Sequence, residues 1–210
     1  MNINTRAEVV LNRLKTRYPV LKTALNWENP WQLLIATVLS AQCTDKQVNK
    51  ITPELFRKWP EPVDLAHAPL DQVAEVIRSA GFYRNKSKNI IASAKIIVSK
   101  FEGKVPSSME DLLVLPGVAR KTANIVLSGA FGLNEGIAVD THVKRIAFRL
   151  GFTSSSNPVI IEKELMNIFV RQDWANLNHM LVFFGRDVCT ARKPGCAVCE
   201  LSDICPRKGL

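Results

Sequence analysis

The sequence contains no apolar run long enough to cross a membrane. A membrane-spanning helix needs about 18 consecutive apolar residues or more. The most apolar stretch, Trp31 to Leu39, is shorter and contains Gln32 and Thr37. The first six residues, MNINTR, also lack the apolar core of a secretory signal peptide. We therefore expect no membrane association and a cytoplasmic protein.

The alternation of apolar and polar residues that marks a half-buried strand is also missing, apart from a candidate strand at Gly136–Val139. There is no internal repeat and no low-complexity tract. Hydrophobic residues make up 47% of the chain and charged residues 22%, which excludes disorder as the main state. The spacing of apolar residues predicts helices over residues 3–18, Trp31 to about Ala41, 45–59, Leu70–Ala80, Asn85–Phe101, Ser108–Val114, Lys121–Phe131, Thr141–Leu150, Pro158–Val170 and Trp174–Val188.

Acidic residues are scarce relative to basic ones. Lys and Arg total 28 against 19 Asp and Glu, a net charge of +9. A polyanionic partner, most often nucleic acid, explains such an excess, and so does general solubility. Between Arg84 and Lys104 the sequence has six basic residues and one Glu, which favours nucleic acid and a nucleoid-associated protein.

Cysteine is rare except at the end of the chain. Four of the five cysteines lie in the last 22 residues, at Cys189, Cys196, Cys199 and Cys205. A cytoplasmic protein rarely forms disulfides, so a metal site is the expected use. Structural zinc sites usually pair two C-x2–4-C elements, and this spacing contains only one C-x2-C. Four thiolates also hold iron–sulfur clusters, so the residues alone leave zinc and iron–sulfur open.

Two apolar helices are separated by a very short turn in residues 112–123, LLVLPGVARKTA. Pro116 and Gly117 break the helical pattern, and the short connection points the start of the second helix outward. The amides and dipole at such a helix start form a phosphate site. An ordinary corner between helices, with Lys121 as a solvated lysine that touches phosphate, is the alternative. Asp140, which precedes a helical pattern, would make a good N-cap.

The string 112–123 resembles the helix–hairpin–helix motif of the endonuclease III family of DNA glycosylases, because Lys121-Thr122-Ala123 follows the turn at the family's spacing. The resemblance extends over almost the whole chain, with the motifs in the family's order. The other motifs are LSAQCTD at 39–45, GFYRNK at 81–86, VDTHVKR at 139–145 and the C-x6-C-x2-C-x5-C spacing of the last four cysteines.

The resemblance implies an all-α protein of two helical domains that flank a DNA-binding cleft. One domain is a six-helix bundle over residues 22–134, with the helix–hairpin–helix at about 108–131. The other joins residues 1–21 to residues 135–210 and is a helical iron–sulfur cluster domain.

The resemblance also implies cofactors. Cys189, Cys196, Cys199 and Cys205 would hold one [4Fe–4S] cluster per chain. A monovalent cation would bind backbone carbonyls of the hairpin, which Leu113, Leu115 and Val118 would supply.

The activity implied is that of a monomeric, bifunctional DNA glycosylase and AP lyase. It would remove oxidised pyrimidines from double-stranded DNA and cut the strand at abasic sites. Lys121 would be the nucleophile, and Asp140, facing it across the cleft, would activate it and stabilise positive charge on the sugar.

The family also fills the gap left by the extruded nucleotide, and Gln42 and Phe82 match those positions. By residue type alone, the glutamine would be solvated and the phenylalanine buried in the core. The other DNA contacts that the resemblance implies are Gly117, Val118, Ala119, Arg120, Thr122 and His142.

One position departs from the family's hairpin, which usually has glycine where this chain has Ala119. If the position needed a positive φ, alanine would cost about 1–2 kcal/mol. If it is already helical, alanine is harmless.

Two rival functions differ in chemistry. The adenine-glycosylase branch of the superfamily lacks the catalytic lysine and usually carries an extra C-terminal domain; Lys121 and a chain that ends five residues after Cys205 argue against it. A non-catalytic DNA clamp would explain the charge, but it would not explain Lys121 together with Asp140.

Overall fold

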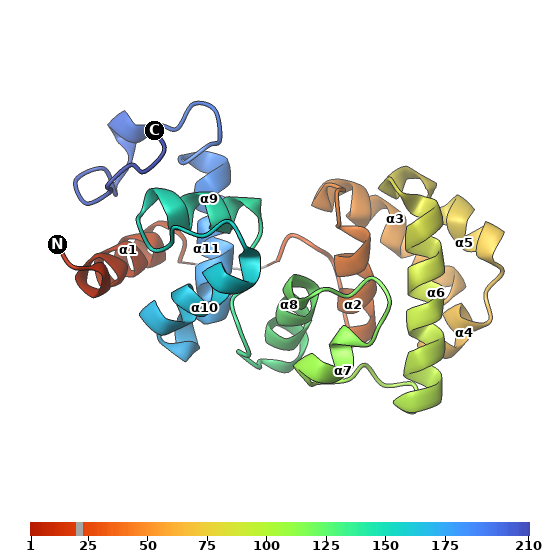
Figure 1. Ribbon diagram of the computed structural model, residues 1–210. Coiled ribbons are helices and arrows are strands. Elements are labelled where there is room, and N and C mark those ends of the chain that lie inside the picture. Colours follow the sequence, from red (N-terminus) through yellow and green to blue (C-terminus); the bar gives the residue numbers. More distant parts are fainter. Residues whose placement is uncertain (20–22) are drawn as a thin grey trace. The chain divides into compact units, whose positions relative to one another are not determined.

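The computed structural model describes residues 1–19 and 23–210. These residues form α-helices, short 3-10 helices and loops, and none of them forms a β-strand (Figure 1). The prediction of an all-α protein is confirmed. Within the same residues, no helix is both long enough and apolar enough to cross a bilayer.

The chain separates into two compact units. Unit 1 combines residues 1–22 with residues 134–210, and unit 2 is the continuous stretch 23–133. Unit 1 is thus built from both ends of the chain. The domain boundary that the family resemblance implies, between residues 21 and 22, lies outside the described residues.

Unit 2 is organised around its most apolar helix, α2 (Pro30–Leu39). The other helices of this unit are α3 (Asp45–Lys58), α4 (Pro62–Ala66), α5 (Leu70–Val76), α6 (Tyr83–Lys100), α7 (Met109–Leu113) and α8 (Arg120–Phe131). Pro30 occupies the first turn of α2, and the Asn29 side chain caps it by accepting a hydrogen bond from the Gln32 amide at 2.9 Å. Every residue from Leu33 to Leu39 is buried, because α3, α6 and α8 pack around this helix (Figure 1).

α6 forms one wall of unit 2 and packs against α4 and α5. Its apolar stripe is buried, as the spacing of Ile90, Ala94 and Ile97 predicts. The helix begins two residues earlier than expected, at Tyr83. The residue before it, Phe82, has a left-handed backbone conformation (φ 46°, ψ 26°), and this sharp bend separates α6 from the preceding 3-10 helix.

Unit 1 is built from α1 (Ile3–Arg17), α9 (Thr141–Arg149), α10 (Pro158–Ile168) and α11 (Trp174–Asp187), followed by a loop over residues 188–210. α9 and α11 approach closely at Gly185. A Cβ atom added at Gly185 would lie 2.6 Å from Nδ1 of His142 and 2.9 Å from Nη2 of Arg145. Only glycine allows α11 to approach these two side chains so closely.

Ion pairs join α1 to the C-terminal loop. Nη2 of Arg13 donates to Oδ2 of Asp203 at 3.0 Å, and Nη1 of Arg17 lies 3.4 Å from Oε1 of Glu200. The apolar face of α1 packs against α10 and α11. The first and last segments of the chain therefore share one core.

Two expectations about secondary structure were wrong. Gly136–Val139 is buried but has no regular secondary structure, and it pairs with no strand in the described residues; the Ala138 carbonyl instead accepts a hydrogen bond from Nδ2 of Asn178. A lone strand in an otherwise helical chain has no ladder to join. The helix expected over Leu70–Ala80 divides into α5 and a 3-10 helix at Arg78–Ala80. In addition, α4 was not predicted from the sequence, because its five residues are too few to show a helical period.

Candidate active site

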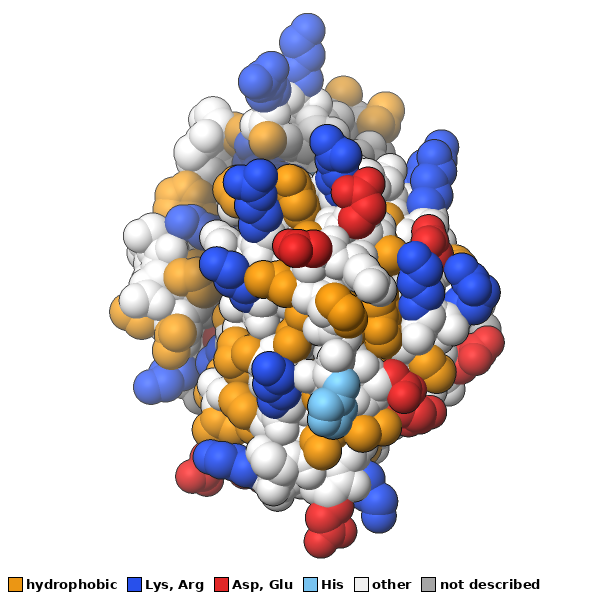
Figure 2. Space-filling view, turned by 90° about the vertical axis from the view of Figure 1, so that its right-hand side faces the viewer, with side chains coloured by type: hydrophobic (Ala, Val, Ile, Leu, Met, Phe, Trp, Pro, Cys, Tyr) orange, Lys and Arg blue, Asp and Glu red, His pale blue; other side chains and the backbone are white. Residues whose placement is uncertain are grey.

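Charge alone does not mark a binding surface on the face shown in Figure 2. Lys and Arg side chains lie there among Asp, Glu and apolar side chains rather than in one patch. The candidate site is therefore described from its motifs, first those of unit 2 and then those of unit 1.

The turn between α7 and α8 depends on one glycine. Gly117 has a φ of 82°, which favours glycine. A Cβ atom there would also lie 2.9 Å from Nδ2 of Asn89 on α6. The Val118 amide donates to the Leu115 carbonyl at 3.1 Å and closes the turn. A larger residue at position 117 would be strained and would collide with α6.

The alanine that replaces the usual second glycine is compatible with the turn. Ala119 has φ −93° and ψ 168°, so the position needs no positive φ and alanine costs nothing on that ground. Ala119 is the N-cap of α8 and offers no side-chain acceptor to the first amides of the helix. In the first turn Lys121 is exposed, and Arg120 and Thr122 are half-buried. The positive end of α8 is thus not neutralised by a capping side chain.

Two loops of unit 2 hold the residues that match the family's gap-filling positions. Gln42 and Phe82 both have left-handed backbone conformations, with φ of 53° and 46°. Phe82 is 66% exposed, so the interpretation of this side chain as part of the core is wrong. Gln42 is exposed. The loops are neighbours, because a Cβ atom added at Gly81 would lie 3.8 Å from the Gln42 carbonyl oxygen.

In unit 1, Asp140 is the N-cap of α9, as its place before the helical pattern predicts. Its Oδ1 atom accepts hydrogen bonds from the amides of His142 at 2.8 Å and Val143 at 2.9 Å. These two bonds fix the plane of the carboxylate. The side chain is therefore held rigidly at the start of a helix, in a half-buried position.

His142 is oriented by a cation from the next turn of α9. Nη2 of Arg145 lies 3.1 Å from Nδ1 of His142 and also donates to the carbonyls of Gly185 and Cys189, each at 3.0 Å. The guanidinium thus lies against the imidazole and ties it to the carbonyls at the end of α11. Burial lowers the pKa of His142 below 6.5; the charge of Asp140 opposes this shift, and that of Arg145 adds to it.

We expect the His142 imidazole to titrate below pH 6.5 in the free protein, measured by NMR. Its folded pKa is lowered, so the unfolded chain binds the proton more readily between that pKa and 6.5. The stability that the neutral imidazole contributes is complete above pH 6.5 and is lost as the pH falls through the folded pKa. Burial also lowers the pKa of His179, so a His142→Gln variant assigns the two signals. A midpoint above 6.5 would contradict the neutral imidazole.

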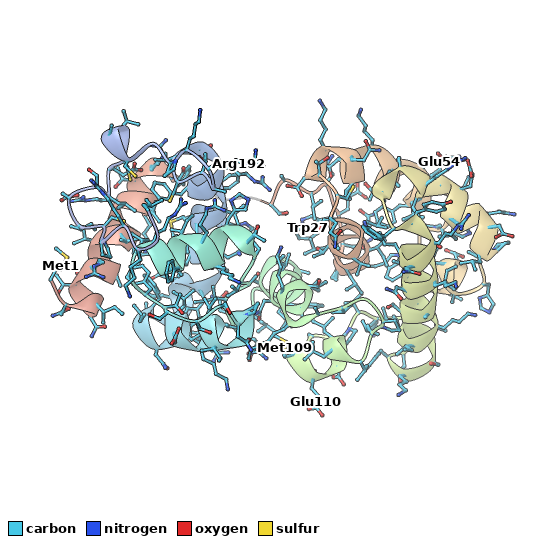
Figure 3. The ribbon with its side chains drawn as sticks, turned by 45° about the horizontal axis from the view of Figure 1, so that its top comes forward. Met1, Trp27, Glu54, Met109, Glu110 and Arg192 are labelled. Atoms are coloured by element: carbon cyan, nitrogen blue, oxygen red, sulfur yellow. The ribbon has the colours of Figure 1, made fainter. Side chains whose placement is uncertain are left out.

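The four C-terminal cysteines line one pocket of unit 1. The pocket is closed by apolar side chains of α9 and α11, among them Ile146 and Phe184, and by the buried Arg149. Arg192, which Figure 3 labels, marks the loop between the first two of the cysteines. Four cysteines that lie up to 16 positions apart in the sequence thus face one cavity.

Hydrogen-bond donors approach the sulfur atoms in this pocket. Nη1 of Arg149 lies 3.3 Å from Sγ of Cys189, and the Leu201 amide donates to Sγ of Cys199 at 3.4 Å. A buried cation and N–H donors suit anionic thiolates and tune an iron–sulfur cluster. In the described residues, no three His, Cys, Asp or Glu side chains form a ready ligand set for a single ion.

Residues 35–171 match a family described as HhH-GPD superfamily base excision DNA repair protein. The chain is 50% identical over 201 residues to Endonuclease III of Synechocystis sp., which covers 96% of this chain and 92% of that protein. The chain belongs to the endonuclease III family. The resemblance that the motifs indicated is therefore confirmed.

Solved structures of endonuclease III are similar over nearly the full chain. One is a non-covalent endonuclease III–DNA complex, 42% identical, with a TM-score of 0.93 and coverage of 99% of this chain and 97% of that one. Another is a trapped endonuclease III–DNA covalent intermediate, 43% identical, with the same TM-score and the same coverage. The described fold is thus that of the endonuclease III family.

Several contacts of polar side chains that support the site were not predicted from the sequence. Arg145 and Arg149 contact the segment of Cys189, but 40 or more residues separate them from it, so no local pattern connects them. Lys86 is different, because it lies four residues before Ile90 on the apolar stripe of α6 and is buried. A charged residue on an apolar stripe was the available signal, and it was missed.

Proposed function

We propose that this chain is a bifunctional DNA glycosylase and AP lyase that removes oxidised pyrimidines from double-stranded DNA in base excision repair. The observation that carries the proposal is the position of Lys121. An exposed primary amine lies in the first turn of a helix whose start has no capping side chain, directly after a turn shaped by Gly117. A phosphate bound at that helix start would bring the neighbouring sugar to the amine.

The chemistry follows from a lysine nucleophile. The neutral Lys121 amine attacks C1′ of the deoxyribose, the bond from C1′ to the base breaks, and the base leaves with the electron pair and takes up a proton. The bound amine loses one proton, the bond from C1′ to the ring oxygen breaks, and that oxygen takes up a proton, which gives a protonated Schiff base between Nζ and C1′. The imine acidifies the hydrogen atoms on C2′. Loss of one of them expels the 3′ phosphate by β-elimination and cuts the strand, and water then releases the lysine.

Asp140 supplies the negative charge that this reaction needs. As the base leaves, positive charge develops on the sugar, and a carboxylate in a partly desolvated site stabilises it. The carboxylate also accepts a proton from the Lys121 amine. The two amide hydrogen bonds at Oδ1 hold the carboxylate in one orientation, so the cap and the catalytic role coexist.

DNA binding is proposed for the hairpin and for the two loops of unit 2. Backbone amides at the start of α8 bind a phosphate, while the buried Val118 fixes the shape of the turn from inside. The exposed Phe82 and Gln42 fill the space left by the extruded nucleotide. His142 donates to a phosphate from a ring N–H. The hairpin residues proposed to contact DNA are Gly117, Val118, Ala119, Arg120 and Thr122.

Cys189, Cys196, Cys199 and Cys205 are proposed to hold a [4Fe–4S] cluster. Such a cluster, when bound, cross-links a loop of little regular structure through four metal–sulfur bonds. Arg149 places a positive charge beside it and ties the loop to α9 by donating to the carbonyls of Thr190 at 2.7 Å and Ala191 at 3.0 Å.

We expect purified protein to be brown and to contain about four iron atoms per chain. Cys199→Ser should lose the iron and the visible absorption and should loosen residues 188–210, because one of four anchors is removed. Iron analysis, absorption and limited proteolysis measure these effects. Cys43→Ser is the matched control and should keep the iron, since Cys43 lies in unit 2. Stoichiometric zinc without iron in anaerobically prepared protein would overturn the assignment.

The remaining proposals concern a cation at the hairpin, the cellular location of the protein and its monomeric state. A monovalent cation at the carbonyls of Leu113, Leu115 and Val118 would stiffen the hairpin, and the Leu115 carbonyl, which accepts one hydrogen bond, keeps a second lone pair for it. We place the protein at the nucleoid in the cytoplasm, acting as a monomer on DNA with damaged bases or abasic sites.

Borohydride trapping tests the proposed function directly. The protein is incubated with a duplex that carries an abasic site, and the imine is reduced to a stable bond. We expect a covalent protein–DNA complex and, without borohydride, a strand cut on the 3′ side of the site. A non-catalytic clamp and a monofunctional glycosylase would give neither product.

A further inference from the structure

Lys86 is the one buried charged side chain among the described residues of unit 2, with 5% of its surface exposed. Its partners are backbone oxygens: Nζ donates to the carbonyl of Leu39 at 2.8 Å and to that of Ala80 at 2.7 Å. Lysine is almost never so buried unless it is paired. Burial lowers the pKa of Lys86, and the nearby Cys43 opposes this shift. A group buried so deeply does not reach a phosphate, so the charge serves another purpose.

The two carbonyls lie at the roots of the two gap-filling loops. Leu39 is the last residue of α2, three residues before Gln42, and Ala80 ends the 3-10 helix two residues before Phe82. The carbonyls at helix ends carry a negative partial charge, so one ammonium group between them satisfies both. Lys86 itself is in the first turn of α6, which starts directly after Phe82.

Both loops adopt backbone conformations that need support. A non-glycine residue in the left-handed region costs about 1–2 kcal/mol, and such residues persist where the surrounding structure holds them. A second link between the two roots exists, since Nε2 of Gln47 donates to Oγ of Ser79 at 2.7 Å, but it is exposed. The buried ammonium is therefore the stronger of the two links.

The same helix also supports the hairpin. Ser93, two turns beyond Lys86 on α6, donates to the Pro116 carbonyl at 2.9 Å, and Asn89 fills the space beside Gly117. One face of α6 thus contacts the roots of both loops and the turn before α8. Any shift of α6 relative to α2 would move Gln42 and Phe82 relative to each other and to the hairpin.

We infer that Lys86 is a positioning residue that ties the Gln42 loop to the Phe82 loop, so that both side chains enter the DNA together when the nucleotide is extruded. This inference rests on the proposed function. It places the role of Lys86 in base extrusion and not in the covalent chemistry at the sugar. The two steps are separable, because a damaged base must first be unpaired and unstacked, whereas an abasic site has no base pair to break.

The test compares Lys86→Met with the wild type on two duplexes. On a duplex with an oxidised pyrimidine, we expect single-turnover base removal to fall about tenfold or more, the loss that removal of hydrogen bonds from a charged donor gives. On a duplex with a preformed abasic site, borohydride trapping should change by less than about threefold. Lys100→Met is the matched control, because Lys100 is exposed at the other end of α6, and it should match the wild type on both.

A double-mutant cycle separates positioning from general damage to the fold. Phe82→Ala should slow base removal strongly in the wild type but should add little in Lys86→Met, because the phenylalanine is already misplaced there. If Lys86→Met loses its helical circular dichroism, and so does not fold, Lys86→Gln takes its place in the test, because glutamine keeps a hydrogen-bond donor. Additive losses, equal losses on both duplexes, or wild-type base removal in the Lys86 variants would overturn the inference. Failure of the wild type to be trapped at all would instead overturn the proposed function.

Discussion

Lys121→Gln is expected to abolish both the borohydride cross-link and strand cleavage at an abasic site, while DNA binding stays largely intact. Glutamine has a similar length but no nucleophilic amine, so neither the attack on C1′ nor the Schiff base forms. Binding remains because it rests on the amides at the start of α8 and on the loops of unit 2, and the substitution leaves both in place. Denaturing gels measure the cross-link and the cut, and a mobility shift measures binding.

A second lysine variant serves as the control for charge. Lys104→Gln removes one positive charge from an exposed position of unit 2 that has no part in the proposed chemistry. It should cross-link and cut like the wild type. If Lys121→Gln still forms the cross-link, the nucleophile is another amine and the mechanism proposed above is wrong. If it loses binding as well, the side chain has a direct part in holding DNA.

Asp140→Asn is expected to slow base removal by about a hundredfold or more while leaving the melting temperature nearly unchanged. Asparagine keeps the oxygen that accepts from the amides of His142 and Val143, and it caps helices as well as aspartate does. What it loses is the negative charge beside the sugar, and such electrostatic stabilisation is worth factors of about a hundred to a thousand in rate. Single-turnover kinetics and a thermal melt measure the two effects.

A capping role and a catalytic role of Asp140 predict different effects of substitution on reaction rate and stability. If the side chain is only a cap, Asp140→Asn is active and stable, whereas Asp140→Ala is destabilised by about 1 kcal/mol. If it is also catalytic, both variants are slow and only the alanine variant melts earlier. Near-normal turnover in Asp140→Asn would show that Asp140 has only a structural role.

Much of the fold could be predicted because it rests on local patterns. α2 is apolar almost throughout, α6 carries a long apolar stripe, and Pro30 and Gly103 mark where helical segments begin and end. The Asp140 cap was predictable for the same reason, since N-caps depend on residues within one turn. The four cysteines were found because cysteines placed so close together serve few purposes, of which metal binding is one.

The rest depends on contacts between distant residues or on backbone conformations that residue type does not dictate. Phe82 is exposed because a left-handed bend turns it out of the core, and nothing in a phenylalanine after a glycine indicates such a bend. Ala119 fits because its φ is negative, which the sequence left open. Lys86 meets Leu39 across 47 residues, so its partners appear only once the helices are packed.

The sharing of one core by both ends of the chain sets the order in which the protein can mature on the ribosome. Unit 2 is continuous, so it can fold as soon as its residues have emerged, whereas α1 waits for α10 and α11. At about 5–20 residues per second, the roughly 170 residues that separate α1 from the end of α11 take on the order of 10–30 s to synthesise. Until α10 and α11 have emerged, the buried face of α1, with Ala7, Val10 and Leu14, lacks these native partners. A chain released early by a stalled ribosome would expose that face permanently, a mark by which chaperones and proteases distinguish incomplete copies from finished ones.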